Sequence, residues 1–110
     1  MKTALGLAAL LLVLGPFVPV SAGGDAAAGA RKNRMCQGCH GIAGMRTVYP
    51  DYSVPRLGGQ HAPYIVAALK AYQSGARSHR TMQAIAADLS EQDMQDLAAY
   101  YSGQPAPPAK

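Results

Sequence analysis

The sequence has no Trp, a single Phe and only two Cys among its 110 residues. Two cysteines exclude a scaffold held by several disulfides and a structural zinc site with four Cys ligands. The only Phe, Phe17, lies near the N-terminus, so six Tyr are the only aromatic residues after residue 22. A chain of this size is marginally stable unless a metal, a disulfide or a partner adds to its core. What fills the core is therefore the first question that the composition raises.

Charged residues are also few, with ten Lys and Arg against six Asp and Glu and a formal net charge of +4. The arginines are scattered and no aromatic residues are interleaved among them, which argues against nucleic-acid binding. We interpret the small basic excess as a solvated surface with a weak preference for acidic protein partners.

The N-terminal segment has one charge, Lys2, before an apolar run at residues 5–14 and a series of small residues that ends at Ala22. This order is typical of a secretory signal peptide, and we expect residues 1–22 to be cleaved off. The apolar run is too short for an uncleaved membrane anchor, and two prolines follow it. We therefore expect residues 23–110 to reach the periplasm of a bacterium with no membrane span left after cleavage.

No alternation typical of strands occurs after residue 22, whereas apolar residues recur at helical spacing. We predict an all-α fold of three or four helices in one domain, residues 23–110, ordered over about 25–102 with a Pro/Ala-rich tail at 103–110. Caps and stop signals place the expected elements: Asp25 toward Met35, Gln60 or His61 to Gly75, a short turn or helix around Met82 to Leu89, and a last helix from the Ser90–Asp93 capping box to Gly103.

The last helix carries an apolar stripe, and the region before the second helix is a long loop. The stripe consists of Met94, Leu97, Ala98 and Tyr101. Residues 41–59 hold six Gly or Pro, so we expect an ordered loop without a regular strand. The helices are rich in Ala and cannot fill a core by themselves.

The chemistry of the chain is indicated by Cys36, Gln37, Gly38, Cys39 and His40, which form the C-x-x-C-H signature of covalent c-type haem attachment. Cysteines at i and i+3 lie on one side of a helical turn, where each can form a thioether with a vinyl group of the ring. The following His is then placed to bind the iron from the same side. We therefore predict one haem c, held by Cys36 and Cys39, with His40 as an axial ligand.

Three other interpretations of the cysteine pair are weaker. A thioredoxin-like C-x-x-C motif needs a βαβ context, and the sequence has no strand pattern. A zinc site would need more ligands than two Cys and one adjacent His. A disulfide between residues this close would stabilise almost nothing, because the closed loop is so short.

The iron needs a sixth ligand from the opposite side, and Met82 is our first choice. Met82 lies 42 residues after His40, in a stretch that we expect to be non-helical between the last two helices. His79 is the main competitor because it lies on the same excursion of the chain. We nevertheless expect both His79 and His61 to be exposed polar residues.

The remaining methionines are less suited to the sixth position. Met35 adjoins Cys36 and shares its side of the ring. Met45 follows His40 so closely that the loop would have to wrap tightly around the ring edge. Met94 falls on the apolar stripe, where a core methionine is the better interpretation.

These motifs are similar to those of the short bacterial class I cytochromes c, which occur as single-haem carriers and as the halves of dihaem carriers. The resemblance spans about residues 25–102. The segments that carry it follow one another in the family's order: C-x-x-C-H-Gly at 36–41, Pro55-x-Leu57-x-Gly59-Gln60, Tyr64 to Gly75, Gly75-x-Arg77 leading to Met82, Ile85-Ala86-x-x-Leu89-Ser90, and Leu97-Ala98-x-Tyr100-Tyr101.

The resemblance implies a small α-helical fold around one covalent haem c, with the N- and C-terminal helices crossing. It implies His40 and Met82 as the axial ligands, and Pro55 as the residue whose carbonyl orients the proximal His. Two departures from the family are visible. Residues 42–54 form a longer loop than usual, and residues 78–81 lack the Pro that often precedes the ligand Met.

The expected function is that of a periplasmic electron carrier that passes single electrons between periplasmic or membrane-bound redox proteins. Such a carrier cycles between Fe(III) and Fe(II) with no bond chemistry, so we do not expect an enzyme. Basic residues near the haem edge would steer an acidic partner; the candidates are Arg31, Lys32, Arg77 and Arg80. Two alternatives stay open: a cytochrome subunit permanently bound to a dehydrogenase, and a haem-based sensor with an open or labile sixth position.

Overall fold

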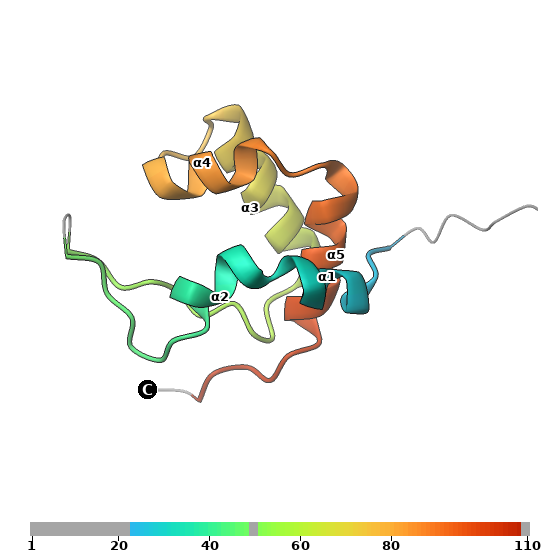
Figure 1. Ribbon diagram of the computed structural model, residues 1–110, viewed down its shortest axis with the longest axis horizontal. Coiled ribbons are helices and arrows are strands. Elements are labelled where there is room, and N and C mark those ends of the chain that lie inside the picture. Colours follow the sequence, from blue (N-terminus) through green and yellow to red (C-terminus); the bar gives the residue numbers. More distant parts are fainter. Residues whose placement is uncertain (1–22, 49–50, 109–110) are drawn as a thin grey trace, which may run out of the picture.

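The computed structural model describes residues 23–48 and 51–108, so the expected signal peptide at residues 1–22 lies outside the described part. Five helices follow one another in this part (Figure 1): α1 (Ala26–Lys32), α2 (Arg34–His40), α3 (Ala62–Ser74), α4 (Arg80–Ala87) and α5 (Glu91–Ser102). The only strand-like pairing among the described residues is an isolated bridge between Arg46 and Ser53. The all-α prediction is therefore confirmed, with five helices instead of three or four.

The additional helix arises at Asn33, which divides the first expected helix into α1 and α2. Asn33 is only 5% exposed, and its side-chain oxygen accepts a hydrogen bond from the Tyr101 hydroxyl on α5. Its side-chain amide donates to the Tyr100 hydroxyl over 3.5 Å. Asparagine is a poor helix former because its side chain competes for hydrogen bonds. Here those bonds fix the junction of α1 and α2 against α5.

The ends of α3 and α5 follow their sequence signals. His61 is the N-cap of α3, and Gly75 ends the helix in the left-handed region with φ 80°, where glycine has no steric penalty. Ser90 and Asp93 form the predicted capping box of α5, each side chain accepting a backbone N–H from the other residue. Both predicted boundaries are confirmed.

The core is small and is centred on α5, which packs against both α1 and α3, while α4 packs on α3 (Figure 1). The predicted stripe of the last helix is confirmed, because its four residues are all buried: Met94, Leu97, Ala98 and Tyr101. Ile65 and Leu69 of α3 complete the core cluster. Met94, at 1% exposure, is its only large side chain that is completely buried. Among the described residues, the protein alone therefore provides little apolar core.

A buried carboxylate joins α1 to α5. Asp96 is 3% exposed and accepts hydrogen bonds from the Asp25 backbone N–H (2.8 Å), Lys32 Nζ (2.6 Å) and Gln92 Nε2 (2.8 Å). Lys32 Nζ also lies 2.7 Å from a carboxylate oxygen of Asp93. Because the buried charge is paired and fully hydrogen-bonded, it orients α1, and with it the start of α2.

The C-terminal residues 103–108 run along the turn at Gly58 and Gly59. The Gly59 N–H donates to the Tyr101 carbonyl over 3.0 Å. A Cβ atom at Gly58 would lie 2.4 Å from the Pro105 carbonyl oxygen, and one at Gly59, where φ is 75°, would lie 2.8 Å from Ala106 Cβ. Only glycine allows this approach, which packs the tail against the segment that leads away from Pro55.

Candidate functional site

The two cysteines of the motif lie on α2 and are free thiols. Cys36 is half-buried and packs against the core cluster, whereas Cys39 is exposed. Burial raises the pKa of the Cys36 thiol, and a hydrogen bond with Tyr101 opposes that shift in part. Both thiols are available for covalent attachment, one at the edge of the core and one at the surface.

The last residue of α2, His40, is oriented by the Pro55 carbonyl. The carbonyl oxygen lies 2.5 Å from His40 Nδ1. A carbonyl can only accept a hydrogen bond, so Nδ1 carries the proton and the lone pair of the ring is on Nε2. A neutral imidazole held in this way is the usual state of a metal-binding His. The contact brings together two residues, Pro55 and His40, that the resemblance pairs.

Met82 lies in the first turn of α4, so the short turn or helix expected around Met82 to Leu89 is a helix, and the expectation that Met82 itself lies in a non-helical stretch was wrong. The helix begins at Arg80, two residues before Met82, because His79 caps it. The His79 Nδ1 atom accepts the Met82 N–H over 3.2 Å. The Met82 side chain is half-buried and packs against the same core cluster as Cys36.

The two other histidine expectations have different outcomes. His61 is exposed as expected, and it is the N-cap residue of α3. The expectation that His79 is exposed was wrong, because the ring is half-buried between two tyrosines. The ring centroids lie 4.9 Å from that of Tyr52 and 6.2 Å from that of Tyr72, both in edge-on geometry. His79 was considered as a ligand competitor, but sequence reasoning missed its role as a cap.

The donor set of this region fits haem c. α2 and α4 do not pack on each other, and both border the cluster formed by α3 and α5 (Figure 1). Two thiols and one imidazole nitrogen come from α2, and one thioether comes from α4. Cysteine thiols in C-x-x-C-H attach the ring, and His with Met is a known axial pair of cytochromes. The chemistry of these side chains therefore matches the group that the motif predicts.

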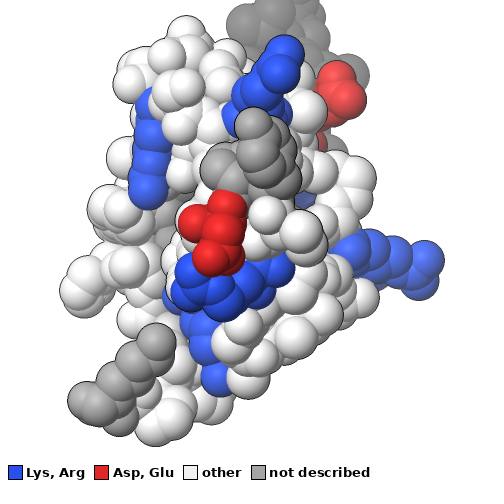
Figure 2. All heavy atoms as spheres, turned by 90° about the vertical axis from the view of Figure 1, so that its left-hand side faces the viewer, with Lys and Arg blue, Asp and Glu red and all other residues white. Residues whose placement is uncertain are grey.

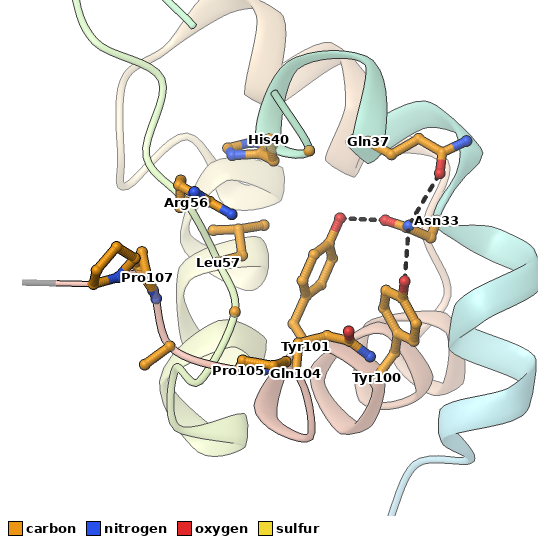
Figure 3. Close-up of a pocket in the computed structure, with 14 residues that line it drawn as sticks. Asn33, Gln37, His40, Arg56, Leu57, Tyr100, Tyr101, Gln104, Pro105 and Pro107 are labelled. Carbon is orange, nitrogen blue, oxygen red and sulfur yellow. Dashed lines mark hydrogen bonds between the residues drawn. The ribbon is translucent and has the colours of Figure 1, made fainter. Parts of the chain in front are cut away.

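A separate cavity of about 430 Å³ lies beside His40 (Figure 3). It is bounded by α2 and its N-cap, the 56–58 segment, the end of α5 and the C-terminal tail; the polar residues among these are Asn33, Gln37, His40, Arg56, Tyr100, Tyr101 and Gln104. Neither cysteine lines it, nor does Met82. The hydrogen bonds of Asn33 with Gln37, Tyr100 and Tyr101 close one side of this space.

The surface charges are partly neutralised by ion pairs. Lys32 is paired with Asp93 and Asp96, so it is not available to steer a partner as expected. Lys70 pairs with Glu91, and Arg46 with Asp51. Among the described residues, five exposed arginines make no ion pair: Arg31, Arg34, Arg56, Arg77 and Arg80. Arg77 instead donates to the Tyr64 hydroxyl over 3.4 Å and lies over the Tyr72 ring. Figure 2 shows basic side chains spread over one face of the molecule instead of gathered in one patch.

No helix within residues 23–48 and 51–108 has the length and apolar character needed to cross a bilayer.

The comparison with protein families identifies the class. Residues 24–100 match the family model described as cytochrome c oxidase, cbb3-type, subunit III. The chain therefore belongs to this family of c-type cytochrome domains, in agreement with its helical fold and its C-x-x-C-H helix. Membership of the family implies a covalently bound haem c.

The relatives specify the resemblance further. Cytochrome c-554(548) of Halomonas halodenitrificans is 44% identical over 84 residues, which are 74% of this chain and 98% of that protein. Cytochrome c4 of Pseudomonas aeruginosa is 38% identical over 98 residues, 89% of this chain and 47% of that protein. The chain thus spans the whole of one relative and about half the length of the other.

A solved structure has the same fold. The structure of reduced recombinant cytochrome c4 from Pseudomonas stutzeri matches with a TM-score of 0.61 and 29% sequence identity, over 74% of this chain and 51% of that one. The chain is therefore similar in size and fold to one half of a cytochrome c4.

Proposed function

We propose that this chain is a single-haem electron carrier of the periplasm. Residues 1–22 would direct its export as a signal peptide and would then be cleaved off. One observation supports the proposal most strongly. Cys36 of α2 and Met82 of α4 border one apolar cluster, and at the end of α2 the Pro55 carbonyl leaves the lone pair of His40 on Nε2. Thioether attachment, one imidazole ligand and one thioether ligand can thus be provided beside a single apolar cluster.

Each residue has a defined role in this proposal. Cys36 and Cys39 would hold the ring covalently, and His40 Nε2 and the Met82 sulfur would bind the iron. Pro55 fixes the imidazole through the 2.5 Å contact with Nδ1. When bound, the haem supplies an iron that takes up or releases one electron without making or breaking a bond.

The protein side chains set the reduction potential of the iron. A thioether paired with an imidazole favours the ferrous state more than two imidazoles do, so Met82 raises the reduction potential. Apolar residues at the same edge exclude water from the site; among them are Leu57, Val66 and Leu89. With both axial positions filled by the protein, no position is left for a substrate, in keeping with a carrier instead of an enzyme.

The partners of the carrier are redox proteins of the same compartment. The arginines without ion pairs give the surface a positive charge that favours docking of an acidic partner. Two relatives, each 38% identical, are named thiosulfate dehydrogenase electron acceptor, one in Stutzerimonas stutzeri and one in Thiomonas intermedia. These names make a periplasmic dehydrogenase a reasonable donor class for this chain, whether the chain docks transiently or is held permanently.

The proposal is tested on the full chain expressed with its own N-terminal segment in a bacterium that attaches haem to exported proteins. We expect a periplasmic product that retains haem after denaturation, and whose reduced spectrum in alkaline pyridine is that of a haem with two thioether bonds. Reversible one-electron reduction without carbon monoxide binding at neutral pH would support the carrier. Rapid carbon monoxide binding by the reduced protein would favour a sensor with a labile sixth position. Loss of the haem on denaturation would contradict covalent attachment.

A further inference from the structure

The longer loop between His40 and Pro55 has a defined structure in its two arms, residues 45–48 and 51–54, which we call the clasp. The Thr47 N–H donates to the Tyr52 carbonyl over 3.0 Å, and the Val54 N–H donates to the Met45 carbonyl over 2.9 Å. These bonds run in opposite directions between the arms, as in a short hairpin. The clasp is therefore a paired structure instead of an irregular excursion.

Side chains hold the two arms together. The Arg46 guanidinium donates from Nε and Nη2 to the two carboxylate oxygens of Asp51, both over 3.0 Å, and from Nη1 to Ser53 Oγ over 2.8 Å. A bidentate Arg–carboxylate pair has a fixed relative geometry. These bonds hold the two neighbours of Tyr52 in the chain, Asp51 and Ser53, and so fix the position of the Tyr52 backbone.

Tyr52 contacts the residue that caps the helix of Met82. Its ring meets the His79 ring edge-on, with centroids 4.9 Å apart and planes at 81°. Tyr72 of α3 meets the same ring at 6.2 Å and 76°. His79 is therefore located between the clasp and α3, in the edge-on geometry that aromatic rings prefer.

His79 then fixes the first turn of α4. Its Nδ1 accepts the Met82 N–H over 3.2 Å, and its own N–H donates to Gln83 Oε1 over 3.2 Å. An N-cap side chain can bond only if its acceptor atom is correctly aimed, so the orientation of the His79 ring determines whether this turn is capped. Met82 lies in that turn.

We propose that Tyr52, through His79, positions Met82 as the sixth ligand; this inference rests on the axial role proposed for Met82. The clasp lies in the chain between His40 and Pro55, which are in contact with each other on the side of the first proposed ligand. It therefore connects the two sides of the site. The clasp and His79 therefore act together as one positioning device.

The test compares holoprotein variants by titrating the ferric form with imidazole, which competes with Met82 for the iron. Tyr52→Ala and His79→Ala should each tighten the apparent imidazole affinity roughly three- to tenfold, because a poorly positioned thioether is displaced more easily. Tyr52→Phe keeps the ring and should stay within about twofold of the wild type. The double variant should not exceed His79→Ala alone, since both act through one contact.

Two controls separate positioning from general stability. Val48→Ala changes the same loop at a side chain that is 94% exposed, and it should not alter the imidazole affinity. Ser90→Ala removes the capping box of α5 and should lower the melting temperature without a change in imidazole affinity.

The outcomes are distinguishable. If Tyr52→Ala shifts the imidazole affinity no more than these two controls do, while the wild-type spectrum shows thioether ligation, the positioning role is overturned and the carrier proposal stands. If the wild-type ferric protein shows no thioether ligation, the axial role of Met82 falls, and the positioning role falls with it.

Discussion

At the scale of single residues, one hydrogen bond determines the tautomer of His40, and the position of Met82 in α4 determines which residues surround its side chain. The Pro55 carbonyl accepts from Nδ1 and leaves Nε2 free for the iron, with no other residue needed to choose the tautomer. Met82 has a half-buried side chain at the edge of the core cluster. In the proposed axial role its sulfur would approach the iron from an apolar surface, where a weak neutral ligand competes well with water.

Replacement of this ligand is the most direct residue-scale prediction. Met82→Ala should lower the reduction potential by on the order of 0.1 V, a fraction of the roughly 0.8 V that axial ligands span, and should allow carbon monoxide to bind the reduced form. Potentiometry and absorption spectroscopy measure both effects. Met94→Leu is the matched control, because Met94 is buried in the core and a change of similar volume should leave the spectrum unaltered. An unchanged potential in Met82→Ala would contradict the axial assignment.

The sequence was sufficient to propose Met82 but not to describe its surroundings. Spacing from His40 and exclusion of the other methionines selected the residue. The start of its helix was not located because the cap is a histidine, whereas Ser, Thr, Asp and Asn are the usual N-caps. The contact of Tyr52 with His79 joins residues that are far apart in the chain, so no local pattern indicates it.

At the scale of elements, the helices whose ends carry strong local signals were predicted well. Gly75 and the Ser90–Asp93 box mark ends that depend on neighbouring residues only. The division of α1 from α2 at Asn33 and the packing of α1 on α5 depend on long-range partners. Asn33 and Tyr101 are 68 residues apart, and Lys32 and Asp96 are 64 apart. Such contacts exist only once the chain has folded, and composition and spacing do not reveal them.

The α1–α5 ion pairs predict a dependence of stability on acid. Hydrogen bonds from Lys32 and Ser90 lower the pKa of Asp93 from 3.8 to about 2. A carboxyl whose pKa is lower in the folded state stabilises the fold above its unfolded pKa, and this contribution is lost as the pH falls from 3.8 toward 2. We expect a loss of about 1 kcal/mol in unfolding free energy over that interval, allowing for solvent screening. Denaturant titrations at several pH values measure it.

Asp93→Asn should remove this part of the acid dependence, because the amide does not titrate. Asp88→Asn is the control, since Asp88, the C-cap residue of α4, is exposed and makes no ion pair within the described residues. The linkage would be refuted if the two variants retained the same slope of stability against pH between 4 and 2.

At the scale of the whole molecule, the small core agrees with the scarcity of aromatic residues, since the sequence has no Trp and one Phe. Six residues form the buried cluster, and Met94 is the only large side chain in it that is less than 2% exposed. The described helices are rich in Ala, as expected, so their apolar faces carry few large side chains. A covalently held porphyrin supplies the large aromatic centre that Trp and Phe do not, which makes the cofactor a structural component as well as a redox centre.

The whole-molecule prediction is that the polypeptide without haem has no stable fold. A Cys36→Ala/Cys39→Ala chain, expressed without its cofactor, should show reduced helix content and no cooperative thermal transition, because removal of the ring leaves a core too small to offset chain entropy. Far-ultraviolet circular dichroism of this chain and of the wild-type holoprotein measures the difference. A cooperative melt of the double variant with native helix content would contradict the prediction.

The way α4 is packed determines where the protein begins to unfold on heating. Within the described fold α5 is packed on both sides, whereas α4 has α3 as its main helical neighbour. Segments with few packing partners unfold locally before the rest of a domain, so α4 belongs to the first cooperative unit to detach. If Met82 is the iron ligand as proposed, heating should release it before the other helices melt. The visible spectrum will change at a lower temperature than the helical signal, and electron transfer will fail while most of the fold is intact.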